Sequence, residues 1–211
     1  MPEQTKRDAK LVQYLSEAYG KEKELEMALE AHIGMTERAA YKKRLQQHLK
    51  ETKGHSRQLE QRIKKLGGGA QTLQSLTGKA MAAAKGPLHA LRGGNEQERM
   101  LKNAKTEYFN EHEEIATYTA IETLAESVGD NETAKLAREI RRDEERMAKF
   151  LAGQIPVLTK AVVTAEVPAS ERSQANGGRR RRASRSSRST RGRSSSRRSR
   201  SSSSSSRSSA R

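Results

Sequence analysis

The sequence predicts an all-α protein: a four-helix bundle with one long crossover, followed by a disordered basic tail. Four segments carry apolar residues at alternating steps of three and four, which is the spacing of one buried helix face. The links between these segments are short, long and short, and the last part of the chain is almost only Ser and Arg. No segment of useful length alternates apolar and polar residues as a β-strand does.

We expect the first helix at about residues 8–33. Its apolar stripe runs from Leu11 to Leu29, and Glu22 stands where the stripe needs another apolar residue. A buried carboxylate is costly unless it is paired or bound to a cation. The first helix therefore indicates a polar site inside the bundle.

The third and fourth helices, expected at about 97–128 and 132–152, repeat this pattern. Glu111 and Glu114 lie in the middle of the third stripe, and Glu144 lies in the middle of the fourth. Four carboxylates in one core point to a shared partner. A duplicated helical hairpin would bring them together at the centre of the bundle.

Two other polar residues are expected near solvent. Glu107 lies at the start of the third stripe, where we expect a frayed helix end and a solvated side chain. His32, near the end of the first helix, is expected to be an ordinary surface residue.

The second helix, expected at about 38–66, carries histidines in its stripe. His48 and His55 replace apolar residues, and Glu51 lies one turn from both. Steps of three and four let these side chains lean toward one side of the helix. Carboxylate with a little imidazole suits iron or manganese. The predicted metal ligands are Glu22, Glu51, His55, Glu111, Glu114 and Glu144. The alternative is a buried polar network of carboxylates with Arg, Tyr or His that binds no metal.

The connections favour one type of bundle. A short link around Gly34 joins the first two helices, with Thr36 as the expected N-cap, and Gly129-Asp130-Asn131 joins the last two. About thirty residues, from Gly67 to Asn95, separate the second and third helices. One long crossover between two short turns is typical of the ferritin-like four-helix bundle.

Composition excludes several classes of protein. The 211 residues contain no Cys, which excludes disulfides, thiolate nucleophiles and sulfur-ligated metal sites. No apolar run approaches the length of a membrane span, and the N-terminus lacks the apolar stretch of a secretion signal. We therefore expect a cytoplasmic protein with no membrane partner.

The basic charge is concentrated at the C-terminus. We expect a bundle over residues 1–165 and a disordered Arg/Ser-rich tail over 166–211. Residues 172–211 contain fourteen Arg and no acidic residue, so the rest of a chain with net charge +16 carries only +2. Such a segment cannot fold alone, and its expected partner is nucleic acid, DNA first of all, bound without sequence reading. The arginines expected to bind it are Arg179, Arg180, Arg181, Arg182, Arg185, Arg188, Arg191, Arg193, Arg197, Arg198 and Arg200. A solubilising extension is the alternative.

Four stretches of the chain together resemble the YciE/YciF family of bacterial ferritin-like proteins. They lie at residues 22–25, 48–55, 111–118 and 143–147. The most specific is Glu-His-x-Glu-Ile-Ala-x-Tyr in the third helix. The resemblance implies a four-helix bundle, di-iron or di-manganese ligation and an association with stress.

The sequence departs from the wider di-metal pattern, which places Glu-x-x-His on two helices. Glu51 and His55 are four residues apart, and Met147 stands where a His would follow Glu144.

Two functions remain open at this point. The first is a ferritin-like stress protein that oxidises Fe(II) or consumes peroxide at a di-metal site. Its tail would tether it to nucleic acid and place it at the nucleoid. The second is a metal-free nucleoid-associated protein that coats DNA. Either is expected to form a homo-dimer or higher homo-oligomer. An RNA-processing protein of the Arg/Ser type is disfavoured, because stacking aromatics are scarce: the two Phe are Phe109 and Phe150.

Overall fold

The fold is all-α throughout the part of the chain that the structure describes. This computed structural model describes residues 4–69, 73–75, 78 and 94–172, and no strand occurs among them. The long helices are α1 (Lys6–Met35), α2 (Ala39–Lys65), α4 (Glu96–Ser127) and α5 (Asn131–Glu166). By their contacts, residues group into two units, Met1–Glu166 and Val167–Arg211, and the four helices belong to the first. The predicted helical bundle is confirmed, while most of the predicted tail lies outside the described residues.

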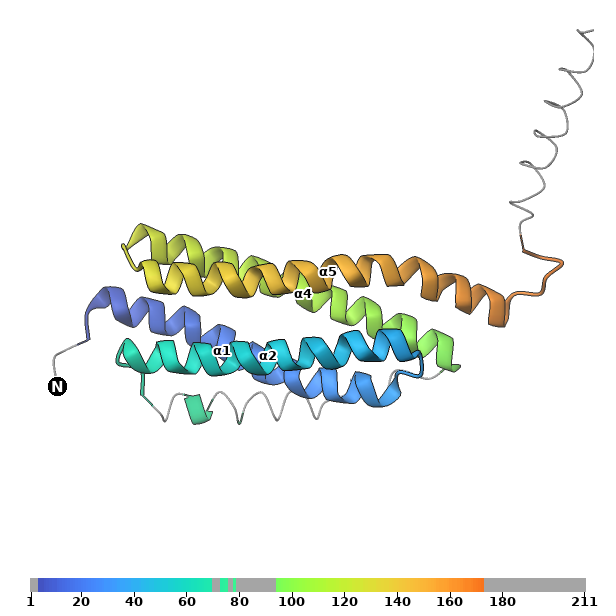
Figure 1. Cartoon of the computed structure of the whole chain (residues 1–211), viewed down its shortest axis with the longest axis horizontal. Coiled ribbons are helices and arrows are strands. Elements are labelled where there is room, and N and C mark those ends of the chain that lie inside the picture. The colour runs from blue at the N-terminus through green and yellow to red at the C-terminus, as the bar shows by residue number, and fades with distance from the viewer. Residues whose placement is uncertain (1–3, 70–72, 76–77, 79–93, 173–211) are drawn as a thin grey trace, which may run out of the picture. The chain divides into compact units, whose positions relative to one another are not determined.

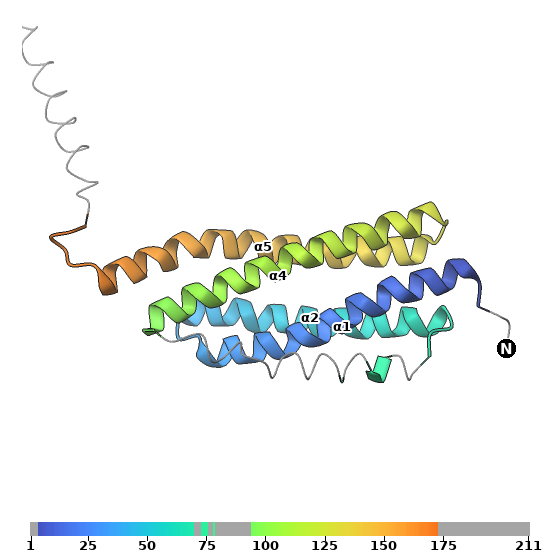
Figure 2. The ribbon, with the colours of Figure 1, turned by 180° about the vertical axis from the view of Figure 1, so that it is seen from behind.

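The four helices form two antiparallel hairpins that lie against each other (Figure 1). One hairpin is α1 with α2 and the other is α4 with α5, and the view from behind shows the same pairing (Figure 2). Between α1 and α4, Lys21 pairs with Glu113 and His32 pairs with Glu107, so these two helices run antiparallel. Since α2 is also antiparallel to α1, α2 and α4 point the same way.

Two consecutive helices that point the same way need a link as long as the bundle. The 27 residues of α2, at about 1.5 Å per residue, span about 40 Å. The chain must return over this distance before α4 begins, which explains the long segment between them. The predicted ferritin-like arrangement, with one long crossover after the second helix, is confirmed.

The two short turns differ in the residues that end one helix and cap the next. In the α4–α5 turn, Gly129 has a φ of +74°, a conformation that favours glycine at the end of a helix. Asp130 Oδ1 then accepts a 3.0 Å hydrogen bond from the backbone N–H of Thr133 and caps α5. The prediction for the α1–α2 turn is wrong, because the Thr36 hydroxyl donates to the carbonyl of His32 at 2.7 Å and so belongs to the end of α1.

Arg62 fastens the end of α2 to the α4–α5 turn. Its guanidinium donates to both carboxylate oxygens of Asp130, at 2.7 and 2.5 Å, and to the hydroxyl of Thr133 at 2.7 Å. Both bonds to Asp130 come from Nη2, and hydrogen bonds between two charged groups are stronger than those between neutral groups. Arg62 therefore joins the two hairpins at one end of the bundle.

The core consists of two apolar clusters with a polar layer between them. The first cluster, on the side of the α4–α5 turn, includes Leu11, Leu15, Leu59, Ile121 and Ile140. The second, toward the opposite end, includes Leu29, Leu45, Met100, Met147 and Leu151. Each helix passes from one cluster to the other, so its middle turns form the polar layer. Packing on both sides holds that layer in place.

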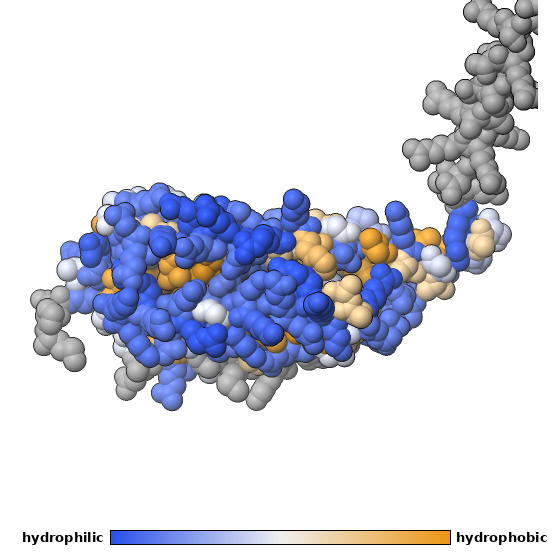
Figure 3. Space-filling view, in the orientation of Figure 1, coloured by the Kyte–Doolittle hydropathy of each residue, from blue (hydrophilic) through white to orange (hydrophobic). Residues whose placement is uncertain are grey.

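α5 is longer than predicted, since it continues past residue 152 and through Pro156. Leu158, beyond the proline, is fully buried, so burial of this face outweighs the backbone hydrogen bond that a proline removes. The outer face exposes Val157 and Val163. Figure 3 shows apolar residues at this end of an otherwise largely hydrophilic face. None of the described helices is both long and apolar enough to cross a membrane.

Candidate metal centre

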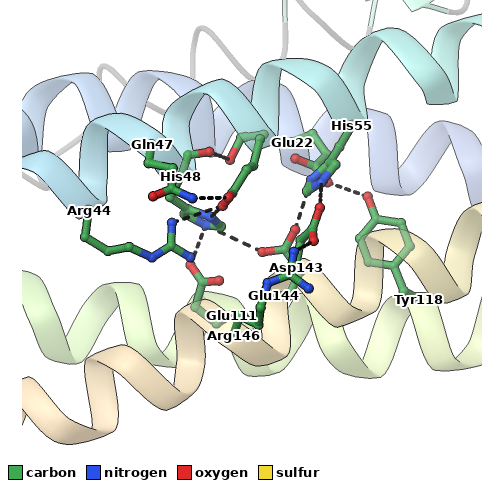
Figure 4. Close-up of polar contacts among 12 residues, drawn as sticks. Glu22, Arg44, Gln47, His48, His55, Glu111, Tyr118, Asp143, Glu144 and Arg146 are labelled. Atoms are coloured by element: carbon green, nitrogen blue, oxygen red, sulfur yellow. Dashed lines mark hydrogen bonds and ion pairs between the residues drawn. The ribbon is translucent and has the colours of Figure 1, made fainter.

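The polar layer at the middle of the bundle is a group of carboxylates and histidines (Figure 4). All four helices contribute, because each carries at least one polar residue in its inward stripe. The members are all buried: Glu22 on α1, His48 and His55 on α2, Glu111 and Glu114 on α4, and Glu144 on α5. We call these six residues the carboxylate–histidine cluster.

One half of the cluster is built around His55. Its Nδ1 lies 3.0 Å from Oε1 of Glu144 and 3.4 Å from Oε1 of Glu22. Its Nε2 lies 3.1 Å from Oδ2 of Asp143, which holds the ring in this orientation. Glu22, His55 and Glu144 each offer a ligand atom, and these atoms lie within 4.8 Å of one another.

The other half is built around His48. Its Nε2 lies 3.1 Å from Oε1 of Glu111 and 3.5 Å from Oε2 of Glu144, and these three residues form a second group with ligand atoms within 4.8 Å. Glu144 belongs to both groups, with one oxygen toward each histidine. A carboxylate placed in this way can bridge two neighbouring ions.

Glu51, a predicted ligand, lies beside the cluster. It accepts hydrogen bonds from Arg44 and Gln47, both at 3.0 Å. Its Oε2 lies 3.2 Å from Nδ1 of His48, on the other side of that ring from Glu111. Its side chain is about one-fifth exposed. Glu51 therefore orients His48, and neither close group of ligand atoms includes it.

Glu114, also a predicted ligand, is buried in the layer without belonging to either group. Its Oε1 has no hydrogen-bond partner among the described residues. Burial raises its pKa well above the ordinary value, and the nearby carboxylates of Glu22, Glu144 and Glu111 raise it further. Lys21 offsets only part of this effect, so burial and the neighbouring carboxylates disfavour the charged form of Glu114.

The histidines carry the protons when no cation is bound. Burial alone would lower the pKa of His48, but Glu111 and Glu51 reverse the effect and raise it to about 10. Burial opposes protonation of His55 in the same way, and Glu144 and Glu22 raise its pKa to about 10. Two imidazolium groups then balance part of the negative charge of the cluster.

The cluster still has more acceptors than donors. Three cluster oxygens are buried and have neither a hydrogen bond nor an ion pair among the described residues: Oε2 of Glu22, Oε2 of Glu111 and Oε1 of Glu114. The two oxygens of Glu144 are held only by ion pairs with the two histidines. Leaving such atoms unpaired is costly, and a cation would satisfy the carboxylate oxygens together. Buried oxygen and imidazole ligands in this arrangement can hold a metal ion.

Sequence reasoning missed one residue of the cluster and two buried residues beside it. His48 was recognised as a polar residue in the stripe but was not among the predicted ligands. Glu107 and His32, both expected near solvent, are buried, and His32 Nδ1 lies 2.5 Å from Oε1 of Glu107. The Tyr41 hydroxyl donates to the other oxygen of Glu107 at 2.6 Å. The expectation failed because the buried face of α4 begins earlier than the predicted stripe, with Met100 and Asn103, so Glu107 is in the middle of that face.

The predicted nucleic-acid-binding arginines, from Arg179 to Arg200, lie outside the described residues. Arg172, which precedes them, donates from Nε to the carbonyl of Val167 at 2.7 Å.

A four-helix bundle with one long crossover and a buried carboxylate–histidine layer defines a ferritin-like protein. The chain belongs to the family described as Domain of unknown function (DUF892), whose model matches residues 6–164. The resemblance to the YciE/YciF proteins is thereby confirmed. A comparison with the curated proteins gives no match.

Solved structures show the same fold. A protein of Xanthomonas campestris pv. campestris has 26% identity and a TM-score of 0.62, over 77% of this chain and 99% of that one. YcfI of Rhodopseudomonas palustris has 21% identity and a TM-score of 0.58, over 72% of this chain and 96% of that one. The E. coli stress protein YciF has 21% identity and a TM-score of 0.56, over 74% of this chain and 98% of that one.

Proposed function

We propose that this protein is a ferritin-like stress protein that holds a pair of iron or manganese ions in the carboxylate–histidine cluster. The observation that carries the proposal is the position of Glu144. Its Oε1 belongs with His55 and its Oε2 with His48, and each histidine has a further carboxylate beside it. Two ions bound in these two groups would share one bridging carboxylate.

The ligand types support iron or manganese. The cluster contains four carboxylates and two imidazoles, the same numbers that ferritin-like di-metal proteins use, although here both histidines come from α2. Oxygen ligands with some imidazole suit both metals. Four carboxylates also match the charge of two divalent ions, which makes the buried layer neutral.

Metal binding would compete with protons. A histidine must be neutral to bind a metal. The neighbouring carboxylates raise the pKa values of His48 and His55 to about 10, so a metal ion must displace a proton from each ring. Asp143 and Glu51 keep both rings oriented after that proton leaves. A bound pair of iron or manganese ions would supply redox chemistry toward oxygen or peroxide.

The tail extends the proposal to nucleic acid. Its fourteen arginines and lack of acidic residues favour binding to the phosphates of DNA through counterion release. The tail would keep the metal centre close to DNA, in the cytoplasm and at the nucleoid. We also propose a homo-dimer or higher homo-oligomer as the working form, which would present several tails to one duplex.

Metal analysis of the purified full-length chain tests this function. Protein grown with iron and manganese should carry up to two ions per chain, one for each group of ligand atoms. Protein that carries no transition metal and takes up no Fe(II) would contradict the proposal. That result would favour the metal-free alternative, in which contacts between histidine and carboxylate alone stabilise the layer and the protein coats DNA.

A further inference from the structure

A small cavity lies between α1 and α4 beside the carboxylate–histidine cluster. His48 and Glu111 line it where it meets the cluster, and His32 and Glu107 also line it. The space open to the centre of a water molecule is about 10 Å³, which is about the volume of a single water site. Leu25 and Leu29 line it as well. The cavity is therefore a narrow space with mixed polar and apolar walls, in contact with two cluster residues.

The cavity also reaches partly exposed residues. Ala28 on α1 and Asn110 on α4 line it, and both are half-buried. Ala28 contributes only a methyl group to this boundary between the helices. A solute that passes these two residues meets the cluster along the edge of the second apolar part of the core, where Leu29 also lines the cavity.

Ion pairs close the boundary between α1 and α4 on both sides of the cavity. On one side, Nζ of Lys21 lies 2.9 Å from Oε2 of Glu113. On the other, Nδ1 of His32 lies 2.5 Å from Oε1 of Glu107. Ala28 falls between Lys21 and His32 along α1. The cavity is thus a gap between two fixed contacts in the middle of the helices.

Two unpaired atoms belong to residues that line this space. Glu107 holds Nδ1 of the fully buried His32, and Tyr41 in turn holds Glu107. Nε2 of His32 is buried and has no hydrogen-bond partner among the described residues. A carboxylate that fixes an imidazole in this way leaves the other nitrogen available to a cation or a water molecule. Oε2 of Glu111 is likewise buried and unpaired among the residues described.

Three other hollows on the described surface do not reach the cluster. The hollow between α2 and α5 includes Arg62, and the hollow between α4 and α5 includes His112 and Ala152. A third lies near Arg38 and Lys160. None of these three is lined by a member of the carboxylate–histidine cluster.

We propose that the cavity at Ala28 and Asn110 is the entry route for divalent metal ions to the carboxylate–histidine cluster. Because the space holds only about one water molecule, an ion must exchange its hydration shell for protein ligands as it enters. His32 Nε2 is the first of these ligands and Glu111 Oε2 is the next. The inference rests on the proposed function, since it requires that the cluster takes up metal.

Replacing Ala28 with Leu tests the route, because the larger side chain fills the opening without removing a ligand. Leu also suits a helix nearly as well as Ala. The measurement is the rate of Co²⁺ uptake by the metal-free full-length protein, followed by the visible absorption of the bound ion. Ala28→Leu should slow uptake by about tenfold, equivalent to about 1.4 kcal/mol in the barrier, and should leave the final amount of bound Co²⁺ unchanged.

Ala152→Leu is the matched control. It makes the same substitution in the hollow between α4 and α5, which no cluster residue lines, and should take up Co²⁺ at the wild-type rate. Asn110→Ala is a second variant that widens the opening, and it should take up Co²⁺ faster than the wild type. This variant keeps the test decisive if Ala28→Leu folds poorly.

The outcomes separate this inference from the proposed function. If the wild type binds Co²⁺ and all three variants do so at its rate, the route is wrong while the metal centre stands. If the wild type binds neither Co²⁺, Fe²⁺ nor Mn²⁺, the proposed function fails and the route fails with it. Slow uptake by Ala28→Leu alone, with a full final amount, supports the route.

Discussion

The hydroxyl of Tyr118 on α4 donates to Oε1 of Glu22 on α1, with 2.5 Å between the two oxygens. Both side chains are buried, and Glu22 also lies beside His55 on α2. This hydrogen bond joins the two hairpins at the edge of the carboxylate–histidine cluster. It also replaces one of the hydrogen bonds to water that the Glu22 carboxylate loses on burial.

Tyr118→Phe removes that donor and little else. We expect the free energy of unfolding of the metal-free protein to fall by about 1 to 3 kcal/mol, the usual cost of leaving a buried acceptor unpaired. Urea titration measures the change. Tyr14→Phe is the control, because Tyr14 is only half-buried and its hydroxyl has no hydrogen bond among the described residues. Equal stability of the two variants would show that the Tyr118 hydroxyl contributes nothing to folding.

Glu114→Gln separates binding of metal from stability of the fold. Glu114 is buried among other carboxylates, which raise its pKa, so its neutral replacement relieves repulsion. The metal-free variant should be as stable as the wild type or more stable. Its affinity for Mn²⁺ should fall at least about tenfold, since even residues behind the ligands usually have effects of this size.

Glu113→Gln is the matched control for this variant. Glu113 is the neighbouring residue, but it faces solvent and pairs with Lys21. Isothermal titration with Mn²⁺ and urea unfolding should both give values close to those of the wild type. A Glu114→Gln protein that binds Mn²⁺ as tightly as this control would exclude Glu114 from the metal centre.

Asp130→Asn should change how stability depends on pH. Burial alone would raise the pKa of Asp130, but the backbone N–H of Thr133 and the Arg62 guanidinium lower it below the ordinary value of 3.8. The resulting stabilisation is present above pH 3.8 and is lost as the pH falls through the lower value of the folded state. The wild type should therefore exceed Asp130→Asn in stability at neutral pH, and the difference should shrink in acid.

Urea unfolding from about pH 6 to about pH 3, on either side of ordinary carboxyl pKa values, measures this difference. Glu126→Gln, which changes a more exposed carboxylate on the same hairpin, should show no such trend. A difference between the wild type and Asp130→Asn that stays constant over this range would contradict the role given to the Arg62–Asp130 pair.

The sequence predicted the fold because each helix keeps its 4-3 stripe and because the turns differ so much in length. The same stripe located Glu22, Glu111, Glu114 and Glu144, since a carboxylate in an apolar stripe is conspicuous. Periodicity gives the face of a helix on which a residue lies. It does not give the partner that this residue meets on another helix.

The errors follow from that limit. Glu107 is buried because His32, which is 75 residues away, and Tyr41 come from other helices to pair with it. Glu51 was predicted as a ligand from its spacing to His55, and Arg44 and Gln47, both on α2 itself, hold its carboxylate beside the cluster. The contacts of Glu107 depend on how the hairpins pack, and the periodicity of a single helix does not give that packing.

The tail should account for most binding to nucleic acid. Deleting residues 172–211 removes fourteen arginines and leaves a chain with a net charge of only +2. Helicity and metal uptake should not change, because α1, α2, α4, α5 and the whole cluster lie before residue 172. Circular dichroism and metal analysis of the shortened protein check these two expectations.

Binding of the full-length protein to duplex DNA should be steeply dependent on salt and indifferent to sequence. If six of the fourteen arginines contact phosphates, the logarithm of the association constant should fall with a slope of roughly −5 against the logarithm of salt concentration. Fluorescence anisotropy with two unrelated duplexes measures the affinity and the slope together. Phosphorylation of the serines between the arginines should weaken binding as the deletion does, because it neutralises the same charge. Equal affinity with and without residues 172–211 at moderate salt would place the binding surface on the helical bundle instead.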